Sequence, residues 1–157
     1  MRLASGNPAT YILLAEDNPA DIELVREALQ DRQILCGLHV VSDGEQAVTF
    51  IDRIDSDSSL SCPKLFLMDL HLPKRNGDEV LTRLRSSERC PNTPVVVMTS
   101  LASRRDIERT CQHGNVHYFQ KPTTLERFLE LGDVVKNLVD ERNLSDIAAA
   151  DGRHERA

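Results

Sequence analysis

Five side chains in this sequence carry the groups that phosphoryl chemistry needs. Glu16 and Asp17 form an acidic pair, Asp69 is a further carboxylate, and Thr99 and Lys121 supply a hydroxyl and an ammonium group. Three carboxylates held close together would repel one another, so a divalent cation is expected among them, and all-oxygen ligands suit Mg²⁺. A carboxylate nucleophile, a metal ion, an ammonium group and a hydroxyl group together make a site for a transferring phosphoryl group.

Short apolar segments position these residues, because each segment ends at one of them. The segments are 11–15 before the acidic pair, 64–68 before Asp69, 94–98 before Thr99 and 116–120 before Lys121, with a further strand expected near 38–41. Continuous apolar runs are typical of parallel strands covered on both faces, and open α/β sheets place their chemistry at the carboxyl ends of such strands. We therefore predict a single doubly wound α/β domain of five strand–helix units.

Capping residues mark where the helices begin. Asn18-Pro19 is a strong helix start, and Ser42–Glu45 and Thr123–Glu126 have the capping-box pattern. Residues 55–59 are polar and predict a loop. The expected helices run from 19 to about 30, from 43 to 54, from 77 through the apolar positions 80, 81 and 84, from 103 to 113, and from about 124 to 142.

The bulk composition excludes several classes of protein. With 157 residues the chain fits one domain, and its net charge of −6 argues against a nucleic-acid-binding surface, which needs clustered Lys and Arg. No stretch approaches the length of a bilayer span, and the polar N-terminus lacks the apolar segment of a signal peptide. We expect a cytoplasmic protein with no membrane and no nucleic-acid partner.

The cysteines show no sequence pattern of a metal site or a redox pair. Cys36, Cys62, Cys90 and Cys111 are widely spaced, so reduced structural thiols are expected. His113 and His117 near Cys111 could suggest metal binding, but they fall across a helix end and a strand, and helical i, i+4 geometry is lost.

In this order along the chain, the acidic pair, the strand-end Asp69, Thr99 and the motif Tyr118-x-x-Lys121-Pro122 resemble a response-regulator receiver domain. The resemblance covers about residues 10 to 140. It implies the flavodoxin-like sheet order 2-1-3-4-5, with residues 1–9 as an extension, 10–142 as the receiver domain and 143–157 as a tail.

The resemblance also implies a role for each site residue. Asp69 would be the phosphoacceptor, and Asp17 and Asp69 would bind Mg²⁺ directly, with Mn²⁺ or Ca²⁺ able to substitute. Glu16 would act mainly through water, and the backbone carbonyl of His71 would complete the ligands. Thr99 and Lys121 would bind phosphoryl oxygens, and Tyr118 would be the switch residue. The Lys121–Pro122 peptide bond would be cis.

The partners follow from the same resemblance. The segment 18–21 and the long connection before the third strand are similar to stand-alone receivers that partner bacterial phytochrome histidine kinases. We expect a phosphorelay signalling protein, not an enzyme. With no output domain following the receiver, the signal would be read by contact with another protein.

The final helix suggests a second copy of the chain as one such partner. Its apolar positions cover more than half of the helix circumference, wider than the stripe that one core contact requires. They are Leu125, Phe128, Leu129, Leu131, Val134, Val135, Leu138 and Val139. Leu131, Val134 and Leu138 form one edge, and Leu144 and Ile147 extend it. We predict a homodimer through this edge and the tail; the alternative is a deeply buried helix.

Two other functions fit parts of the pattern. A dehalogenase-like phosphatase also uses an aspartyl nucleophile and Mg²⁺, but needs a second Asp where this chain has His71. A flavodoxin-like nucleotide carrier needs a phosphate-binding loop after the first strand, where this chain has Glu16-Asp17-Asn18-Pro19. Taken singly, each site residue could also be an ordinary cap, turn or surface group.

Overall fold

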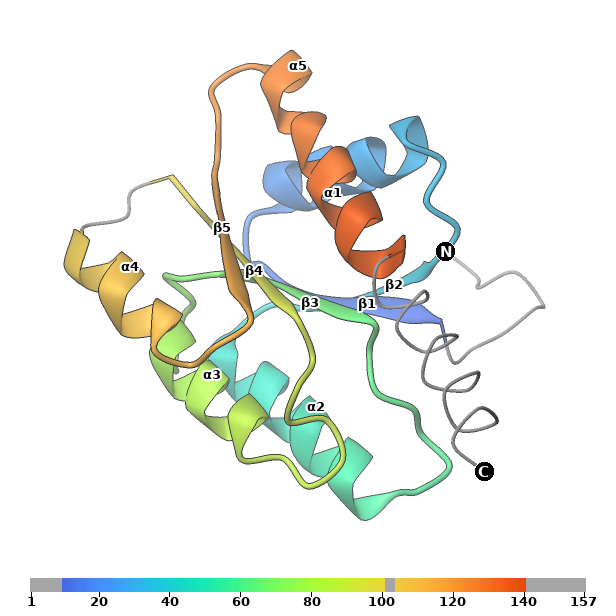
Figure 1. The fold of residues 1–157 in the computed structure, drawn as a ribbon. Helices are drawn as coiled ribbons and strands as arrows, with labels where there is room; N and C mark the ends of the chain where they lie inside the picture. The colour runs from blue at the N-terminus through green and yellow to red at the C-terminus, as the bar shows by residue number, and fades with distance from the viewer. Residues whose placement is uncertain (1–9, 101–103, 141–157) are drawn as a thin grey trace, which may run out of the picture.

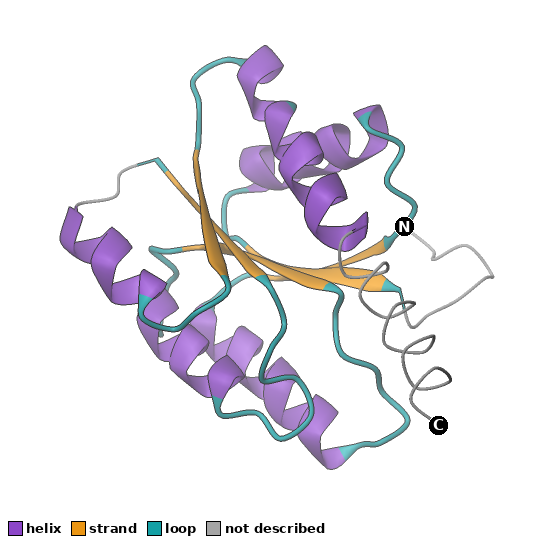
Figure 2. Ribbon diagram, viewed as in Figure 1, coloured by secondary structure: helices purple, strands orange, loops and turns teal. Residues whose placement is uncertain are grey.

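The computed structural model describes residues 10–100 and 104–140, which form one parallel sheet with helices on both faces (Figures 1 and 2). The strands are β1 Tyr11–Ala15, β2 Gly37–Val41, β3 Leu65–Asp69, β4 Val95–Thr99 and β5 Val116–Gln120. The helices are α1 Pro19–Asp31, α2 Gly44–Ser56, α3 Gly77–Arg85, α4 Arg104–Cys111 and α5 Leu125–Phe128, with helical backbone again over 130–140. The sheet order is β2-β1-β3-β4-β5, so the predicted fold class and strand order are confirmed.

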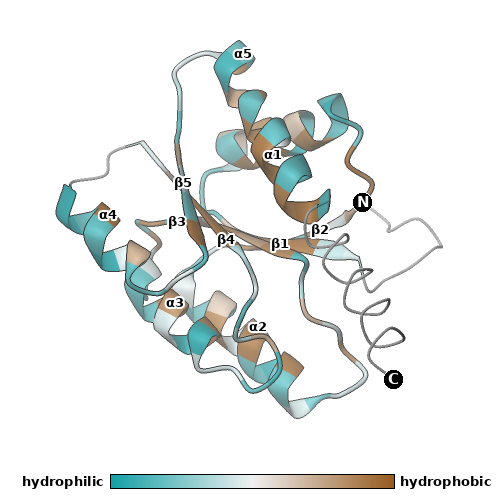
Figure 3. Ribbon diagram, viewed as in Figure 1, coloured by the Kyte–Doolittle hydropathy of each residue, from teal (hydrophilic) through white to brown (hydrophobic). Residues whose placement is uncertain are grey.

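Burial of the central strands explains their unbroken apolar sequences. All five residues of β1 and of β4 are buried, because helices cover both sheet faces. One core cluster joins the sheet to α2 and α3, and the other joins it to α1, α5 and the helical residues that follow α5 (Figures 1 and 3). The hydrophobic effect therefore fixes the sheet in the middle layer, with its carboxyl edge open to the loops.

Capping side chains start the helices, in two cases one residue later than the sequence pattern suggested. Asn18 caps α1, with Pro19 at the first position, as predicted. The cap of α2 is Asp43, whose side chain accepts from the Gln46 N–H at 2.7 Å, and the cap of α5 is Thr124. The boxes predicted to begin at Ser42 and Thr123 were therefore wrong by one position, and Ser103, the predicted start of α4, lies outside the described residues.

The final helix is buried more deeply than its sequence alone indicated. Leu131 is fully buried, so its predicted place on an exposed dimer edge is wrong, while Val134 and Leu138 are half-buried. The reason is close packing on α1, where the Ala28 carbonyl lies 2.6 Å from the position a Cβ at Gly132 would take. Leu144 and Ile147 lie outside the described residues.

The predicted polar loop at 55–59 begins too early, because α2 continues to Ser56. Asp55 accepts from Arg83 Nη2 at 2.9 Å and from Ser87 Oγ at 2.7 Å, which ties α2 to the end of α3. Nearby, the Arg85 guanidinium donates to five backbone carbonyls, those of Pro91, Thr93, His113, Gly114 and Asn115. Side chains thus fasten the loops at the amino edge of the sheet.

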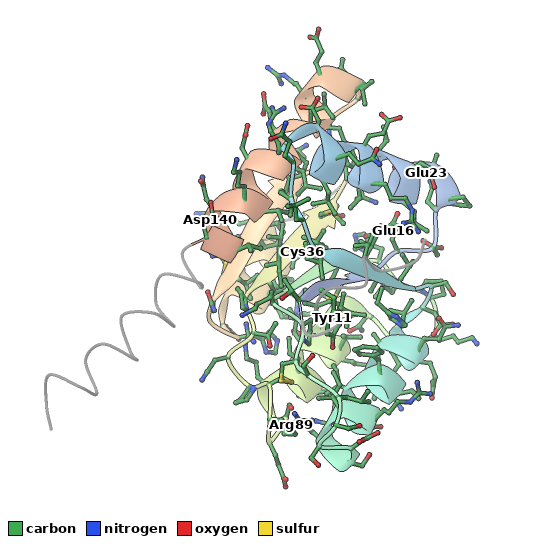
Figure 4. All side chains as sticks on the ribbon, turned by 90° about the vertical axis from the view of Figure 1, so that its right-hand side faces the viewer. Tyr11, Glu16, Glu23, Cys36, Arg89 and Asp140 are labelled. Carbon is green, nitrogen blue, oxygen red and sulfur yellow. A yellow bond between two sulfur atoms is a disulfide. The ribbon has the colours of Figure 1, made fainter. Side chains whose placement is uncertain are left out.

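A disulfide between Cys62 and Cys90 contradicts the prediction of four reduced thiols. Their Cα atoms lie 5.8 Å apart although 28 residues separate them in sequence, because the loops before β3 and before β4 run side by side. Arg89, labelled in Figure 4, donates to the carbonyls of Ile54 and Asp57 in the same region. Cys36 and Cys111 are free thiols, as predicted.

None of the described helices is both long enough and apolar enough to cross a bilayer.

The Asp55 contacts predict a pH-dependent contribution to stability. Burial acts to raise the pKa of Asp55, but the bonds from Ser87 and Arg83 outweigh it and lower the pKa to about 2. The ionised carboxylate therefore stabilises the fold above pH 4, and this contribution is lost as the pH falls from about 4 to about 2. We expect Asp55→Asn to lower the free energy of unfolding by about 1–2 kcal/mol at pH 7 and by less at pH 3, measured by urea denaturation.

Glu130→Gln, at an exposed carboxylate on the final helix, serves as the control and should change stability little at either pH. An equal loss for Asp55→Asn at pH 7 and pH 3 would contradict the ionic role.

Candidate phosphoryl and metal site

Three carboxylates meet at the carboxyl edge of the sheet, as the sequence predicted. Glu16 and Asp17 follow β1, and Asp69 ends the neighbouring strand β3. One oxygen atom from each of the three lies within 4.8 Å of the others. Glu16, labelled in Figure 4, is fully buried, whereas Asp17 is exposed and Asp69 is half-buried. The group therefore has one inner carboxylate and an outer side open to solvent.

The ammonium group of Lys121 lies among these carboxylates. Its Nζ donates to Glu16 Oε1 at 2.9 Å, to Asp69 Oδ2 at 2.9 Å and to Asp21 Oδ2 at 2.8 Å. The Lys121 side chain is only 7% exposed, so these contacts replace most of its water. Burial acts to lower the pKa of Lys121, but its bonds to Asp21, Asp69 and Glu16 outweigh that effect and raise it.

The two carboxylates that flank Lys121 respond to it differently. Burial raises the pKa of Glu16 to about 8, although the bond to Lys121 acts in the opposite direction. Burial would likewise raise the pKa of Asp69, but there the bonds from Lys121 and from the His71 N–H prevail and lower it. The His71 N–H lies 2.9 Å from Asp69 Oδ1. Asp69 is therefore held ionised, which is the form in which a carboxylate can act as a nucleophile.

The residues present fit a divalent cation. Glu16 Oε2 is buried without a hydrogen-bond partner, and a buried carboxylate oxygen normally requires one. Asp17 and Asp69 offer further oxygens beside it, and hard cations such as Mg²⁺ and Ca²⁺ prefer oxygen ligands. Glu16, Asp17 and Asp69 would hold such an ion. His71 was also predicted as a ligand; its backbone N–H lies next to Asp69, and its carbonyl role stays a prediction.

Thr99 lies where the sequence placed it, at the end of β4, and is buried. Its carbonyl accepts from the Lys121 N–H at 2.9 Å, which fixes the end of β5 beside β4. The described residues contain no cis peptide bond, so the predicted cis Lys121–Pro122 bond is wrong in this structure. With this bond trans, Lys121 Nζ reaches Glu16, Asp21 and Asp69.

Tyr118 contacts helix α4, away from the carboxylates. Its hydroxyl donates to the Asp106 carbonyl at 3.1 Å and forms a short hydrogen bond with the Thr110 hydroxyl. Burial raises the pKa of Tyr118, with the Thr110 bond acting against it. The predicted switch residue thus links β5 to α4, and the structure does not bring it into the site itself.

A cavity of about 190 Å³ adjoins the site on the α4 side. Its lining includes His71 from the loop after β3, Asp78 from α3, and Arg109 and Thr110 from α4.

Of the other histidines, His113 binds Asp78 through Nε2 at 2.8 Å. Among the described residues, the only group of three candidate metal ligands is Glu16, Asp17 and Asp69.

A comparison with known protein families identifies the family of this chain. The family model for the response regulator receiver domain matches residues 12–132. The chain belongs to this family. Its receiver domain is 37% identical to response regulator Rcp1 of Synechocystis over 101 residues, which is 64% of this chain and 69% of Rcp1.

Solved receiver structures share its fold. The phosphorylated cyanobacterial phytochrome response regulator RcpA superimposes with a TM-score of 0.71 at 31% identity, covering 80% of this chain and 90% of RcpA. The Mn²⁺-bound form of Rcp1 gives a TM-score of 0.70 at 31% identity, covering 82% of this chain and 92% of Rcp1. The predicted resemblance to receivers of phytochrome systems is confirmed.

The sequence did not predict two residues that contact predicted site residues: Asp21, which bonds Lys121, and Thr110, which bonds Tyr118. Asp21 was noted only as part of a helix start, and Thr110 was not singled out. A signal existed for Asp21, since it lies in the first turn of the helix that follows the acidic pair and so near the same sheet edge. Thr110 gave no signal, because its contact with Tyr118 depends on how α4 packs on β5.

The three-carboxylate group predicts stabilisation by divalent cations. A ligand that binds only the folded state raises the melting temperature, so millimolar Mg²⁺ or Mn²⁺ should raise it by several degrees. Asp17→Asn removes one ligand and should abolish most of the rise, measured by circular dichroism at constant ionic strength. The control Glu23→Gln, at an exposed carboxylate on α1 (Figure 4), should retain it. Equal rises in wild type and Asp17→Asn would contradict the assignment.

Proposed function

We propose that this receiver domain accepts a phosphoryl group on Asp69 in a two-component phosphorelay. The observation that carries the proposal is the Lys121 ammonium 2.9 Å from Asp69 Oδ2, beside two further carboxylates that fit a cation. In the transfer, an Asp69 carboxylate oxygen forms a bond to phosphorus. The bond between phosphorus and the donor nitrogen of a phosphohistidine breaks, and its electron pair stays with the imidazole.

Each neighbouring residue has its own part in this step. Asp69 is kept ionised by Lys121 and by the His71 N–H, and Lys121 and Thr99 bind the phosphoryl oxygens in the product. Glu16, Asp17, Asp69 and the His71 carbonyl would hold a divalent cation, for which we propose Mg²⁺, with Mn²⁺ or Ca²⁺ able to replace it. When bound, the ion would offset phosphoryl charge. The Mn²⁺-bound form of Rcp1 supports a divalent ion at such a site.

The phosphoryl donor in this proposal is a histidine kinase, and a bacterial phytochrome is the specific candidate. The likeness to RcpA, a phytochrome response regulator, supports that candidate. The chain then acts in the cytoplasm as a signalling protein rather than as an enzyme with its own substrate, with residues 10–142 as the receiver domain.

The output surface in this proposal includes the face of α4, β5 and the final helix. Movement of Thr99 toward the phosphoryl group would vacate space for Tyr118, and Tyr118 already contacts α4 through Thr110 and Asp106. A change in Tyr118 would therefore bias two arrangements of this face that differ little in free energy.

We also propose a homodimer that uses the outer edge of the final helix and the tail 143–157. Support comes from Val134 and Leu138, which lie on this edge and are only half-buried.

The proposed phosphorylation of Asp69 predicts that a substitution of this residue removes the phosphoryl label. We expect Asp69→Asn to abolish acid-labile labelling by acetyl phosphate or by the kinase, because the amide cannot attack phosphorus. Intact-protein mass spectrometry would detect the added phosphoryl group. Asp31→Asn, at an exposed carboxylate that ends α1, should be labelled like wild type. Undiminished labelling of Asp69→Asn would refute the assignment.

The dimer predicts a change in mass. Leu138→Glu puts a charge on the proposed edge and should convert a dimer to a monomer in sedimentation experiments. Asn137→Glu adds the same charge at an exposed neighbouring position and should leave the dimer intact. A melting curve for each variant separates dissociation from unfolding. If wild type and Leu138→Glu have the same mass, the proposed edge is not a dimer contact.

A further inference from the structure

Asp21 differs from the other two carboxylates that bind Lys121. Glu16 and Asp69 belong to the candidate cation group, whereas Asp21 does not. We propose that Asp21 is a positioning residue that holds the Lys121 ammonium group over Asp69 while the other contacts of Lys121 change. This inference rests on the proposed phosphoacceptor function.

Hydrogen bonds in the first turn of α1 fix the backbone that carries the Asp21 carboxylate. Pro19 occupies the first helical position, and the Asn18 side chain accepts from the Ala20 N–H at 2.9 Å and from the Asp21 N–H at 3.4 Å. The Asn18 carbonyl accepts from the Ile22 N–H at 3.0 Å, which closes the first turn. The backbone of Asp21 is therefore fixed directly after the acidic pair.

The Asp21–Lys121 contact is short and largely shielded from water. Asp21 Oδ2 lies 2.8 Å from Lys121 Nζ, and the two side chains are 22% and 7% exposed. An ammonium group has three donor hydrogens, and Lys121 uses them on three carboxylates. A charge-assisted bond of this kind is stronger than a neutral one, and little water is available to replace it.

The other two contacts of Lys121 cannot remain constant through the proposed reaction. A cation would draw on the oxygens of Glu16 and Asp69, and transfer converts one Asp69 oxygen into the bridging oxygen of an acyl phosphate. Lysine carries its charge on a flexible four-carbon chain, so it needs a constant anchor to keep its position. Asp21 supplies that anchor, and small displacements of a charge-bearing group are costly in transfer reactions.

A carboxylate in the first turn of a helix also stabilises that helix through its dipole, and this role would need no contact with Lys121. The two roles predict different behaviour, because a dipole effect would be independent of Lys121. A double-mutant cycle between positions 21 and 121 separates them.

The kinetic experiment uses acetyl phosphate with the full chain at saturating Mg²⁺. Asp21→Ala should lower the phosphorylation rate constant about tenfold, while Mn²⁺ affinity stays within about twofold. Asp21→Asn retains an acceptor oxygen and should lose less, which also keeps the test open if Asp21→Ala folds poorly. Glu23→Ala, two residues away on α1 and 72% exposed, should react like wild type.

The cycle repeats Asp21→Ala in a Lys121→Ala background, where it should have no further effect on the rate. Urea denaturation of the metal-free proteins should show the same non-additivity, independently of phosphorylation. A wild-type rate for Asp21→Ala and Asp21→Asn, or an equal slowing in both backgrounds, would overturn the positioning role. A wild-type chain that takes no label would instead overturn the proposed function, and the urea cycle would still report whether the two side chains interact.

Discussion

The buried ammonium group of Lys121 is the interaction on which the site depends. It joins carboxylates from β3, from the residue after β1 and from the first turn of α1, and Lys121 is at least 52 residues away from each of them in sequence. Without it, Glu16 and Asp69 would repel each other in a region with little water. The sheet order permits this arrangement, because only β4 lies between β3 and β5. Lys121 reaches back across the end of β4, where the Thr99 carbonyl holds its backbone.

One ammonium group cannot balance all the carboxylates around it. Lys121 has three carboxylate partners, and Asp17 adds a fourth acidic group nearby. The imbalance appears as opposite pKa shifts, upward for the buried Glu16 and downward for Asp69. The buried and unpartnered Glu16 Oε2 points to the same conclusion, that the architecture provides for additional positive charge. A site with this deficit is suited to a cation, which would also offset the charge of an arriving phosphoryl group.

The sequence predicted those features that depend on local pattern. Apolar runs gave all five strands, and their shared carboxyl edge brought Glu16 to Asp69, because parallel strands leave no other place for their ends. Features that depend on tertiary packing were missed or misplaced. The Cys62–Cys90 pair and the Asp55–Arg83 contact need loops or helices far apart in sequence to meet. Leu131 looked available on a helical wheel, yet close packing of the final helix on α1 buries it.

The two edges of the sheet differ in how firmly they are held, and this difference bears on signalling. At the amino edge, Arg85 donates to five carbonyls, and a disulfide and the Asp55 contacts fasten the loops. At the carboxyl edge, α4 buries only Thr110 among its described residues, and its Ile107 is 38% exposed. Elements with few buried contacts are those that change arrangement at low cost. A charge change at Asp69, as we propose, would therefore act on α4 through Thr99 and Tyr118, because Tyr118 contacts α4 through Thr110 and Asp106.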